Sequence, residues 1–366
     1  MNLPYTKNFK RLLLSDTPLI DVRAPVEFES GAFPAAVNLP LMENQEREAV
    51  GICYKEQGSQ KALALGHTLV KEEKKAYRIK AWTDFIDLHP DAVLYCFRGG
   101  ERSRISQEWL HEAGYDIPRI KGGYKAFRRF ILDELDSVGS RFTPLVLGGM
   151  TGTGKTILLG KIEESIDLEG LAKHRGSAFG YKIEPQPTQI NFEHMLATSL
   201  LKKLDRGLCE IVMEDESRRI GKREIPKGLF GALQEAPLVI LEAPMVQRVE
   251  TICHIYVIEF QEEFIRQYGT LNGMKRWEET MRKSLNAIQR KLGGLRYGAI
   301  VSLFDDALRI QRERADFQAH SLWIEALLHE YYDPMYAYQI KENRARIVFR
   351  GEEDAVMSYL KERIEK

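Results

Sequence analysis

Residues 145–156 read LVLGGMTGTGKT, an apolar strand that runs directly into a glycine-rich turn and the start of a helix. The spacing G-x-x-x-x-G-K-[ST] is typical of a phosphate-binding loop in this context. Glycines let backbone N–H groups surround phosphate oxygens without Cβ clashes, and a lysine adds a point charge. A plain glycine-rich turn is the alternative. The expected phosphate-binding residues are Gly149, Gly152, Gly154, Lys155 and Thr156.

The second half of the chain has the pattern of an α/β domain around this loop. Four apolar runs have the length and β-branched content of strands, at residues 210–213, 238–241, 255–258 and 347–349. Because a strand that leads directly into a helix is typical of βα units, we expect a parallel sheet. Residues 261–330 are charged, lack proline and carry apolar residues at helical spacing, which predicts extra helices beside the sheet.

An acidic stretch, CEIVMEDES, occupies residues 209–217 and ends the first of these strands. A carboxylate at such a strand end commonly holds Mg²⁺ beside a phosphate loop. Glu214 and Asp215 are both candidates, and the expected metal ligands are Asp215 and the hydroxyl of Thr156. A helix N-cap is the other role that Asp215 would suit.

A second strand, loop and helix surrounds a cysteine, in DAVLYCFRGGERSRISQEWLHEAG at residues 91–114. The loop N–H groups and the positive end of the helix would converge above the Cys96 sulfur and stabilise a thiolate or an oxyanion. We expect Cys96 and Arg102 to be catalytic, with Arg102 holding an anionic substrate through two hydrogen bonds. A small buried cysteine at a strand end is the alternative. The expected anion-binding loop comprises Phe97, Arg98, Gly99, Gly100 and Glu101.

The chain as a whole is long enough for two cores. It has 366 residues, and single cores rarely exceed roughly 250 to 300 residues. The run LDELDSVGSRFTP at residues 132–144 has the composition of a linker and predicts domains at residues 1–138 and 139–366. Lys plus Arg equals Asp plus Glu at 53 each, so a polyanion must bind to clustered charge. No stretch approaches about 20 apolar residues, so we expect a cytoplasmic protein without a membrane partner.

Two further segments resemble the rhodanese superfamily. Residues 21–41 read DVRAPVEFESGAFPAAVNLPL, with that family's Asp-x-Arg, Glu-Phe, Gly and Asn-x-Pro, and KGGYKAF at residues 121–127 resembles its closing Gly-Gly turn. The resemblance implies a rhodanese-like α/β domain. Five residues separate Cys96 from Arg102, one more than in thiosulfate rhodaneses, so we expect a wider cradle for a tetrahedral, phosphate-like group. Related phosphatases carry His before the cysteine, where this chain has Tyr95.

A rhodanese-like domain followed by a P-loop domain resembles the bacterial tRNA 2-selenouridine synthase family. Further segments that resemble this family are HRGSAFG at residues 174–180, QPTQINFE at 186–193, EDESRRIGKREIP at 214–226 and YYDPMYAY at 331–338. The resemblance implies a transferase that acts on wobble 2-thiouridine in tRNA. The resemblance further implies two stages, in which geranyl diphosphate first alkylates the sulfur and selenophosphate then displaces the thiogeranyl group. It also implies a partner enzyme that supplies selenophosphate.

Arg175 and the basic residues that follow the acidic stretch are the candidates for tRNA binding. Basic side chains that cluster in space can bind phosphates. A run of charged residues is, however, more often a solvent-exposed surface without a ligand. The expected tRNA-binding residues are Arg175, Arg218, Arg219, Lys222 and Arg223.

Two other functions are compatible with these motifs. The first is a P-loop kinase or ATPase joined to a rhodanese-like sulfurtransferase or phosphatase module, and the second is a nucleotide-gated sensor that uses Cys96. Within the preferred interpretation, the P-loop ligand is either geranyl diphosphate or a nucleotide, and Cys96 either forms a selenium adduct or assists selenium delivery.

Overall fold

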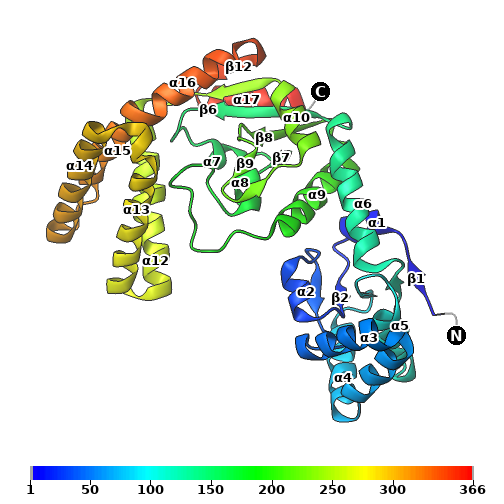
Figure 1. Ribbon diagram of the computed structural model, residues 1–366. Coiled ribbons are helices and arrows are strands. Elements are labelled where there is room, and N and C mark those ends of the chain that lie inside the picture. Colours follow the sequence, from blue (N-terminus) through cyan, green and yellow to red (C-terminus); the bar gives the residue numbers. More distant parts are fainter. Residues whose placement is uncertain (1–2, 365–366) are drawn as a thin grey trace. The chain divides into compact units, whose positions relative to one another are not determined.

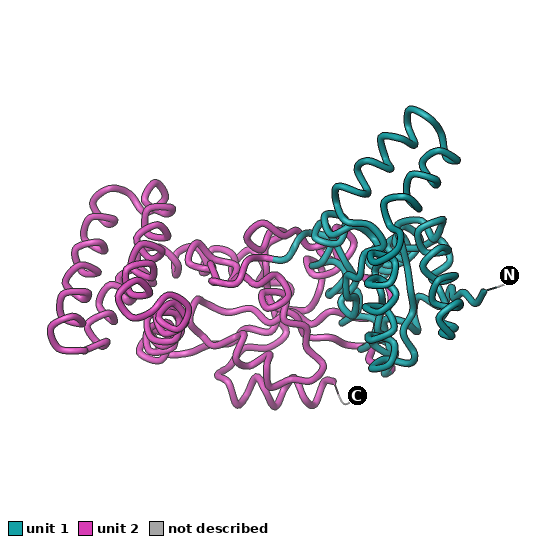
Figure 2. Tube along the Cα trace, turned by 90° about the horizontal axis from the view of Figure 1, so that it is seen from below, with its two compact units in different colours: residues 1–138, 187–206 teal, residues 139–186, 207–366 magenta. Residues whose placement is uncertain are grey.

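The computed structural model describes residues 3–364, which form two compact units (Figure 2). The first unit contains the chain up to residue 138 together with residues 187–206, and the second contains residues 139–186 and 207 onward. The boundary expected between residues 138 and 139 coincides with one edge of these units. Residues 187–206, expected in the C-terminal domain, lie in the first unit instead. The expected linker at 132–144 begins inside a helix, because α6 continues to Ser137.

The first unit is built on a five-stranded parallel sheet, in the order β1-β5-β4-β2-β3. Its strands are β1 (Tyr5–Thr6), β2 (Leu19–Asp21), β3 (Ala36–Asn38), β4 (Val93–Tyr95) and β5 (Arg119–Ile120). Its helices are α1 (Phe9–Leu14), α2 (Pro25–Ser30), α3 (Asn44–Leu69), α4 (Glu73–Leu88), α5 (Glu101–Glu112) and α6 (Gly123–Ser137). Strands β2 and β4 are buried along their whole length, which agrees with the apolar run of β4, whereas β2 ends in the buried carboxylate of Asp21.

Helix α9 (Gln189–Asp205) belongs to this first unit, where it packs against α1 and α6. Its first turn is fixed by the Thr188 hydroxyl, which accepts from the backbone N–H of Asn191. The Asn191 side chain accepts from the Ala32 N–H at 2.8 Å. His194 donates through Nδ1 to the Ala32 carbonyl at 2.7 Å and stacks on Phe33. The segment QPTQINFE, which resembles the family, therefore contributes Asn191 and the buried Phe192 to the first unit.

The second unit has its own five-stranded parallel sheet, in the order β12-β11-β6-β8-β7. Its strands are β6 (Thr143–Gly149), β7 (Ser165–Ile166), β8 (Glu210–Glu214), β11 (Leu238–Leu241) and β12 (Ile347–Gly351). The strands expected at 210–213, 238–241 and 347–349 are confirmed, as is the α/β class of both halves. Helices α7 (Lys155–Leu159), α8 (Leu168–Ala172), α10 (Lys227–Glu235) and α17 (Glu353–Ile364) accompany this sheet. A short hairpin, β9 (Arg219–Ile220) and β10 (Arg223–Glu224), also belongs to this unit.

The strand expected at residues 255–258 is wrong. These residues lie in a π-helical segment, Cys253–Glu259, which continues α11 (Met245–Ile252) into α12 (Phe260–Tyr268). The buried residues Val249, Cys253, Val257, Phe260 and Phe264 recur every three or four positions, and they join the core of the helical part. The helical spacing of these buried residues therefore determines the structure of the segment, although its β-branched composition favoured a strand.

The extra helices expected within residues 261–330 are present and form this helical part (Figure 1). They include α13 (Thr270–Leu292), α14 (Gly294–Arg314) and α15 (Ser321–Leu327), and a π-helical turn at Leu328–Tyr332 leads into α16 (Asp333–Glu342). None of the helices between residues 3 and 364 combines the length and the apolar character that a bilayer crossing requires.

The buried position of His194 predicts a pH dependence of the first unit's stability. Burial, together with the charges of Arg128 and Arg23, lowers the pKa of His194 to about 3, although its bond to Ala32 opposes the shift. The folded state therefore excludes a proton that the unfolded chain takes up below about pH 6.5, and stability falls as pH decreases. We expect the free energy of unfolding to lose about 2 kcal/mol between pH 7 and pH 5 from this group.

His194→Gln keeps a side-chain N–H for Ala32 but cannot titrate in this range. Urea unfolding at both pH values should show a smaller drop for this variant than for the native protein. His254→Gln, at an exposed position, should retain the native drop. Equal drops in all three proteins would contradict the assignment.

Candidate functional site

The cysteine loop begins where β4 ends and is held in place by the turn that opens α6. The N–H of Tyr124 donates to the Cys96 carbonyl at 2.8 Å, and that of Lys125 donates to the Phe97 carbonyl at 2.9 Å. Gly123 has φ 59°, and a Cβ there would lie 2.3 Å from the Cys96 carbonyl oxygen. Only glycine fits this contact. The KGGYKAF motif is therefore the support on which the loop is built.

Cys96 itself is 3% exposed, and its loop leads directly into α5. The Cys96 thiol donates to the Ser103 hydroxyl at 3.2 Å, and that hydroxyl donates to the Gly100 carbonyl at 3.0 Å. The rest of the expected anion-binding loop is more open, with Arg98, Gly100 and Glu101 exposed and Phe97 and Gly99 half-buried. The thiol thus lies beneath a solvent-facing backbone loop.

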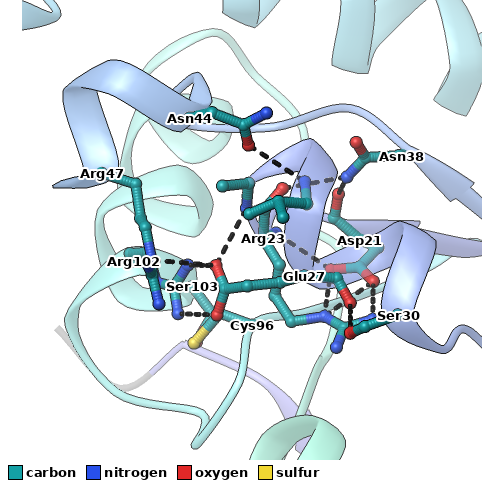
Figure 3. A network of polar contacts seen from close by, with 12 residues as sticks. Asp21, Arg23, Glu27, Ser30, Asn38, Asn44, Arg47, Cys96, Arg102 and Ser103 are labelled. Atoms are coloured by element: carbon teal, nitrogen blue, oxygen red, sulfur yellow. Dashed lines mark hydrogen bonds and ion pairs between the residues drawn. The ribbon is translucent and has the colours of Figure 1, made fainter.

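Arg102 does not extend freely over this loop. It forms a two-bond ion pair with Glu27 of α2, with Nη1–Oε2 at 2.5 Å and Nη2–Oε1 at 3.0 Å (Figure 3). Burial opposes both charges, but the pair outweighs it, raising the pKa of Arg102 and lowering that of Glu27. Glu27 was not among the expected site residues. The feature of the sequence that could have identified Glu27 is the Glu-Phe of the rhodanese-like segment, 75 residues before Arg102.

A second buried ion pair fixes the strand beside Cys96. Arg23 donates through Nη2 to Asp21 Oδ2 at 2.6 Å and to the Gly31 carbonyl at 2.8 Å (Figure 3). The guanidinium also stacks on Tyr124, 3.9 Å from the ring centroid. Both charged groups are almost fully buried, and removing one would leave the other uncompensated. The Asp-x-Arg motif therefore has a structural role at the base of the cysteine loop.

The phosphate loop follows β6 in the second unit, as expected. Gly149 has φ 147°, and a Cβ there would lie 2.4 Å from the Leu241 carbonyl oxygen, while Gly152 has φ 85° and faces the Arg248 carbonyl. Gly154 also has a positive φ, 86°. Lys155 donates through Nζ to the carbonyls of Gly149 and Met150, at 2.8 and 3.2 Å. Burial lowers the pKa of Lys155, although the nearby carboxylates oppose the shift.

A pocket of about 510 Å³ surrounds this loop. Its polar lining includes Lys155, Thr156, Glu169, Arg175, Lys182, Glu214 and Glu216. Its apolar and aromatic lining includes Ile157, Ile252, Ile255, Tyr256 and Tyr336. A smaller recess shares Thr151, Ser177, Ile252 and Tyr256 with it and adds Phe179, Trp323 and Leu327. One region of the site is therefore suited to phosphate and another to a hydrocarbon.

The acidic residues at the end of β8 divide between two environments. Glu214 and Glu216 line the pocket, whereas Asp215, the expected metal ligand, does not and lies near Gly148. Burial raises the pKa of all three carboxyl groups. Glu214 Oε2 accepts from the Leu168 N–H at 2.8 Å, while its buried Oε1 has no hydrogen-bond partner within residues 3–364. Glu214 and Glu216, but not Asp215, therefore share the pocket lining with Thr156, whose hydroxyl donates to Glu169 Oε2 at 3.4 Å.

Magnesium would need ligands beyond these side chains. Among the described residues, no group of three or more His, Cys, Asp or Glu side chains is arranged to hold a metal ion. Mg²⁺ commonly uses one or two carboxylates together with phosphate oxygens and water. The free oxygen of Glu214 and the hydroxyl of Thr156 fit that kind of site.

The expected tRNA-binding residues fall into two groups. Arg218, Arg219, Lys222 and Arg223 lie on or beside the β9–β10 hairpin, where Glu224 pairs with Arg218 at 3.3 Å and Arg219 at 2.8 Å. The Gln186 side chain holds this hairpin by donating to the Ile220 carbonyl and accepting from the Lys222 N–H. Arg175 instead lines the phosphate pocket, and its buried Nη1 has no partner in the described part of the chain.

Comparisons with known proteins match the two halves of the chain to two family models. The family model described as the tRNA 2-selenouridine synthase AAA domain matches residues 142–366, and the rhodanese-like domain model matches residues 6–130. A tRNA 2-selenouridine synthase from Sulfurovum sp. is 52% identical over 98% of this chain and 99% of that protein. The protein of that name from Cupriavidus pinatubonensis is 50% identical over 98% of each chain.

One solved structure is also similar, the N-terminal domain of a putative ATP/GTP binding protein from Clostridium difficile 630. It is 34% identical and covers 35% of this chain and 98% of that chain, with a TM-score of 0.31. The rhodanese-like model lies within the first unit, the other model covers nearly all of the second unit together with residues 187–206 of the first, and the two relatives match over nearly their whole length. The chain belongs to the tRNA 2-selenouridine synthase family.

Proposed function

We propose that this enzyme converts wobble 2-thiouridine in tRNA to 2-selenouridine in two steps, one at each anion-binding loop. The observation that supports this most directly is the presence of two chemically different loops at the ends of parallel strands. One loop carries Lys155 and suits a phosphate group, and the other carries the Cys96 thiol. Neither loop alone has the groups for both steps.

In the first step, the sulfur of 2-thiouridine attacks C1 of geranyl diphosphate. The S–C bond forms, the C–O bond breaks, and diphosphate leaves with the electron pair while the base loses its N3 proton to water. The loop N–H groups and Lys155 stabilise the charge that develops on the diphosphate. Bound Mg²⁺ would add to this charge neutralisation, held by Thr156 and Glu214. The hydrocarbon wall of Ile252, Ile255 and Tyr256 supports an alkyl diphosphate over a nucleotide.

In the second step, selenium from selenophosphate attacks C2 of the alkylated base. The C2–S bond breaks and geranylthiolate leaves, and water cleaves the P–Se bond to give inorganic phosphate. The cysteine loop holds the oxygens of selenophosphate through its N–H groups. We assign to the Cys96 thiol the transfer of a proton to the departing geranylthiolate, with water restoring that proton. Selenophosphate would come from a separate enzyme that supplies it.

The two loops predict variants that fail at different steps. Lys155→Ala should slow geranyl transfer by about 2 to 4 kcal/mol of transition-state stabilisation, so little geranylated tRNA forms. Cys96→Ser leaves that loop intact but replaces the thiol by a much weaker acid. It should slow selenium transfer on the order of 10² to 10⁴-fold and cause geranylated tRNA to accumulate. Mass spectrometry of the tRNA nucleosides distinguishes the two products.

Matched controls exist for both variants. Lys161→Ala removes an exposed lysine that pairs with Glu353 near the same loop, and Cys209→Ser changes an exposed cysteine. Both should retain native rates. Normal geranylation by Lys155→Ala, or normal selenation by Cys96→Ser, would contradict the scheme. ATP or GTP turnover without tRNA would instead favour a P-loop kinase or ATPase.

We further propose that the β9–β10 hairpin contacts tRNA phosphates. Five basic residues between Arg218 and Lys227 surround one acidic residue, Glu224, in a chain without net charge. The side chains of Arg218, Arg219 and Lys222 are exposed. Local positive charge of this kind binds tRNA phosphates with an affinity that falls as the salt concentration rises.

Replacing Arg218 and Arg223 together by alanine should weaken tRNA binding and reduce the slope of log affinity against log salt by on the order of 1 to 2. The measurement is a tRNA binding series from low to high salt. Arg309→Ala with Arg314→Ala, on the exposed face of α14, is the matched control and should keep the native slope. An unchanged slope for the hairpin variant would exclude this surface.

A further inference from the structure

The first unit contains a cavity of about 210 Å³ beside the cysteine loop. It lies between α3, the segment that precedes α3, and the first turns of α5. Most of its lining is hydrocarbon, from Leu41, Met42, Val50, Tyr54, Ala62, Leu63, Val70, Ile105 and Trp109. Glu101 and Arg102, at the end of the cysteine loop, also line it. The cavity thus adjoins the site of the proposed selenium transfer.

The size of this cavity sets it apart from ordinary packing defects. Protein interiors contain few voids larger than a water molecule, and an apolar cavity of about 150 Å³ is enough to bind a small hydrocarbon. This space is open to solvent on one side, since Tyr54 and Leu63 of its lining are exposed. Its apolar walls therefore present hydrocarbon surface to water, and a bound apolar chain would cover that surface.

The helix that forms one wall has few buried anchors. Along its 26 residues, α3 buries only Glu46, Cys53 and Ala62, and it is kinked at Gly58, where φ is 86°. Tyr54 and Leu63, which also line the cavity, remain 61% and 36% exposed. An element with so few packed side chains can shift with little loss of stability. This wall can therefore adjust to a chain that enters beside it.

The charges around the cavity indicate an uncharged occupant. Arg102 is the basic side chain that the lining shares with the cysteine loop, and its guanidinium already donates two hydrogen bonds to the Glu27 carboxylate, which neutralises it. Glu101 pairs with Arg104 in the same way. An anion would find no unpaired arginine here, whereas a hydrocarbon chain would contact the lining and leave both ion pairs intact.

We infer that this cavity binds the alkyl chain of the S-alkylated base and thereby places C2 of that base at the cysteine loop. The inference rests on the proposed function and deepens it, because it assigns the first unit a site that selects the alkylated intermediate over unmodified 2-thiouridine. The chain enters with the base and leaves with its sulfur as the thiol. No bond to the cavity is made or broken.

The test uses the full-length enzyme and tRNA alkylated beforehand on sulfur with methyl, five-carbon prenyl or geranyl groups. Each buried CH₂ strengthens binding about fourfold at most, so we expect KM for selenation to fall at least tenfold from the prenyl to the geranyl substrate. Ala62→Phe fills the cavity, since Ala62 is 3% exposed on its wall. It should raise KM for geranylated tRNA about tenfold and abolish the dependence on chain length, with geranyl transfer unchanged.

Ala64→Phe adds the same ring to the exposed side of α3 and should behave like the native enzyme. Calorimetric binding of the nucleoside S-geranyl-2-thiouridine provides a readout independent of turnover and should be lost in Ala62→Phe alone. A native enzyme with no chain-length dependence overturns the cavity inference even if the variant does not fold. A native enzyme that makes no selenouridine from geranylated tRNA overturns the proposed function, and the nucleoside binding then decides the cavity.

Discussion

Both sites depend on one constraint, the close approach of backbone to backbone where a parallel strand passes into its loop. At Gly123 a Cβ would lie 2.3 Å from the Cys96 carbonyl oxygen, and at Gly149 it would lie 2.4 Å from that of Leu241. Neither position tolerates a side chain, so glycine allows the neighbouring segment to fix the loop before a ligand binds. Donors that are already in place stabilise developing charge without reorganisation. The chemistry of each site follows from what this arrangement presents, a thiol in one unit and a lysine in the other.

The polar side chains around the cysteine loop are mainly structural supports. Asp21 with Arg23, and Glu27 with Arg102, form paired charges in buried or half-buried positions. Helix α9 adds Asn191 and His194, which bind the backbone of Ala32 next to the Gly31 carbonyl that Arg23 contacts. The segment from Gln186 to Glu193 thus supports the basic hairpin at its beginning and the first unit's core further on. Because residues along this whole segment make structural contacts, the resemblance to the family extends over all of residues 186–193.

The features that the sequence predicted are those encoded by neighbouring residues. An apolar run followed by a glycine-rich turn correctly predicted the position of both loops. Most strands were predicted from their apolar and β-branched composition. Long-range contacts were missed, as with Glu27 opposite Arg102 and α9 in the first unit. The sequence could not show which of Glu214 and Asp215 lines the pocket, because successive side chains at a strand end point to opposite sides. The error at residues 255–258 arose because β-branched residues also occupy buried helices.

In the proposed reaction, the two loops act one after the other and independently. The most direct test supplies the Lys155→Ala variant with selenophosphate and with tRNA that was geranylated beforehand. The formation of 2-selenouridine is then measured by mass spectrometry. If the phosphate loop serves only the first step, this protein should selenate the tRNA at the native rate although it cannot geranylate it. Loss of selenation to the same extent as loss of geranylation would contradict the claim and indicate a single shared site.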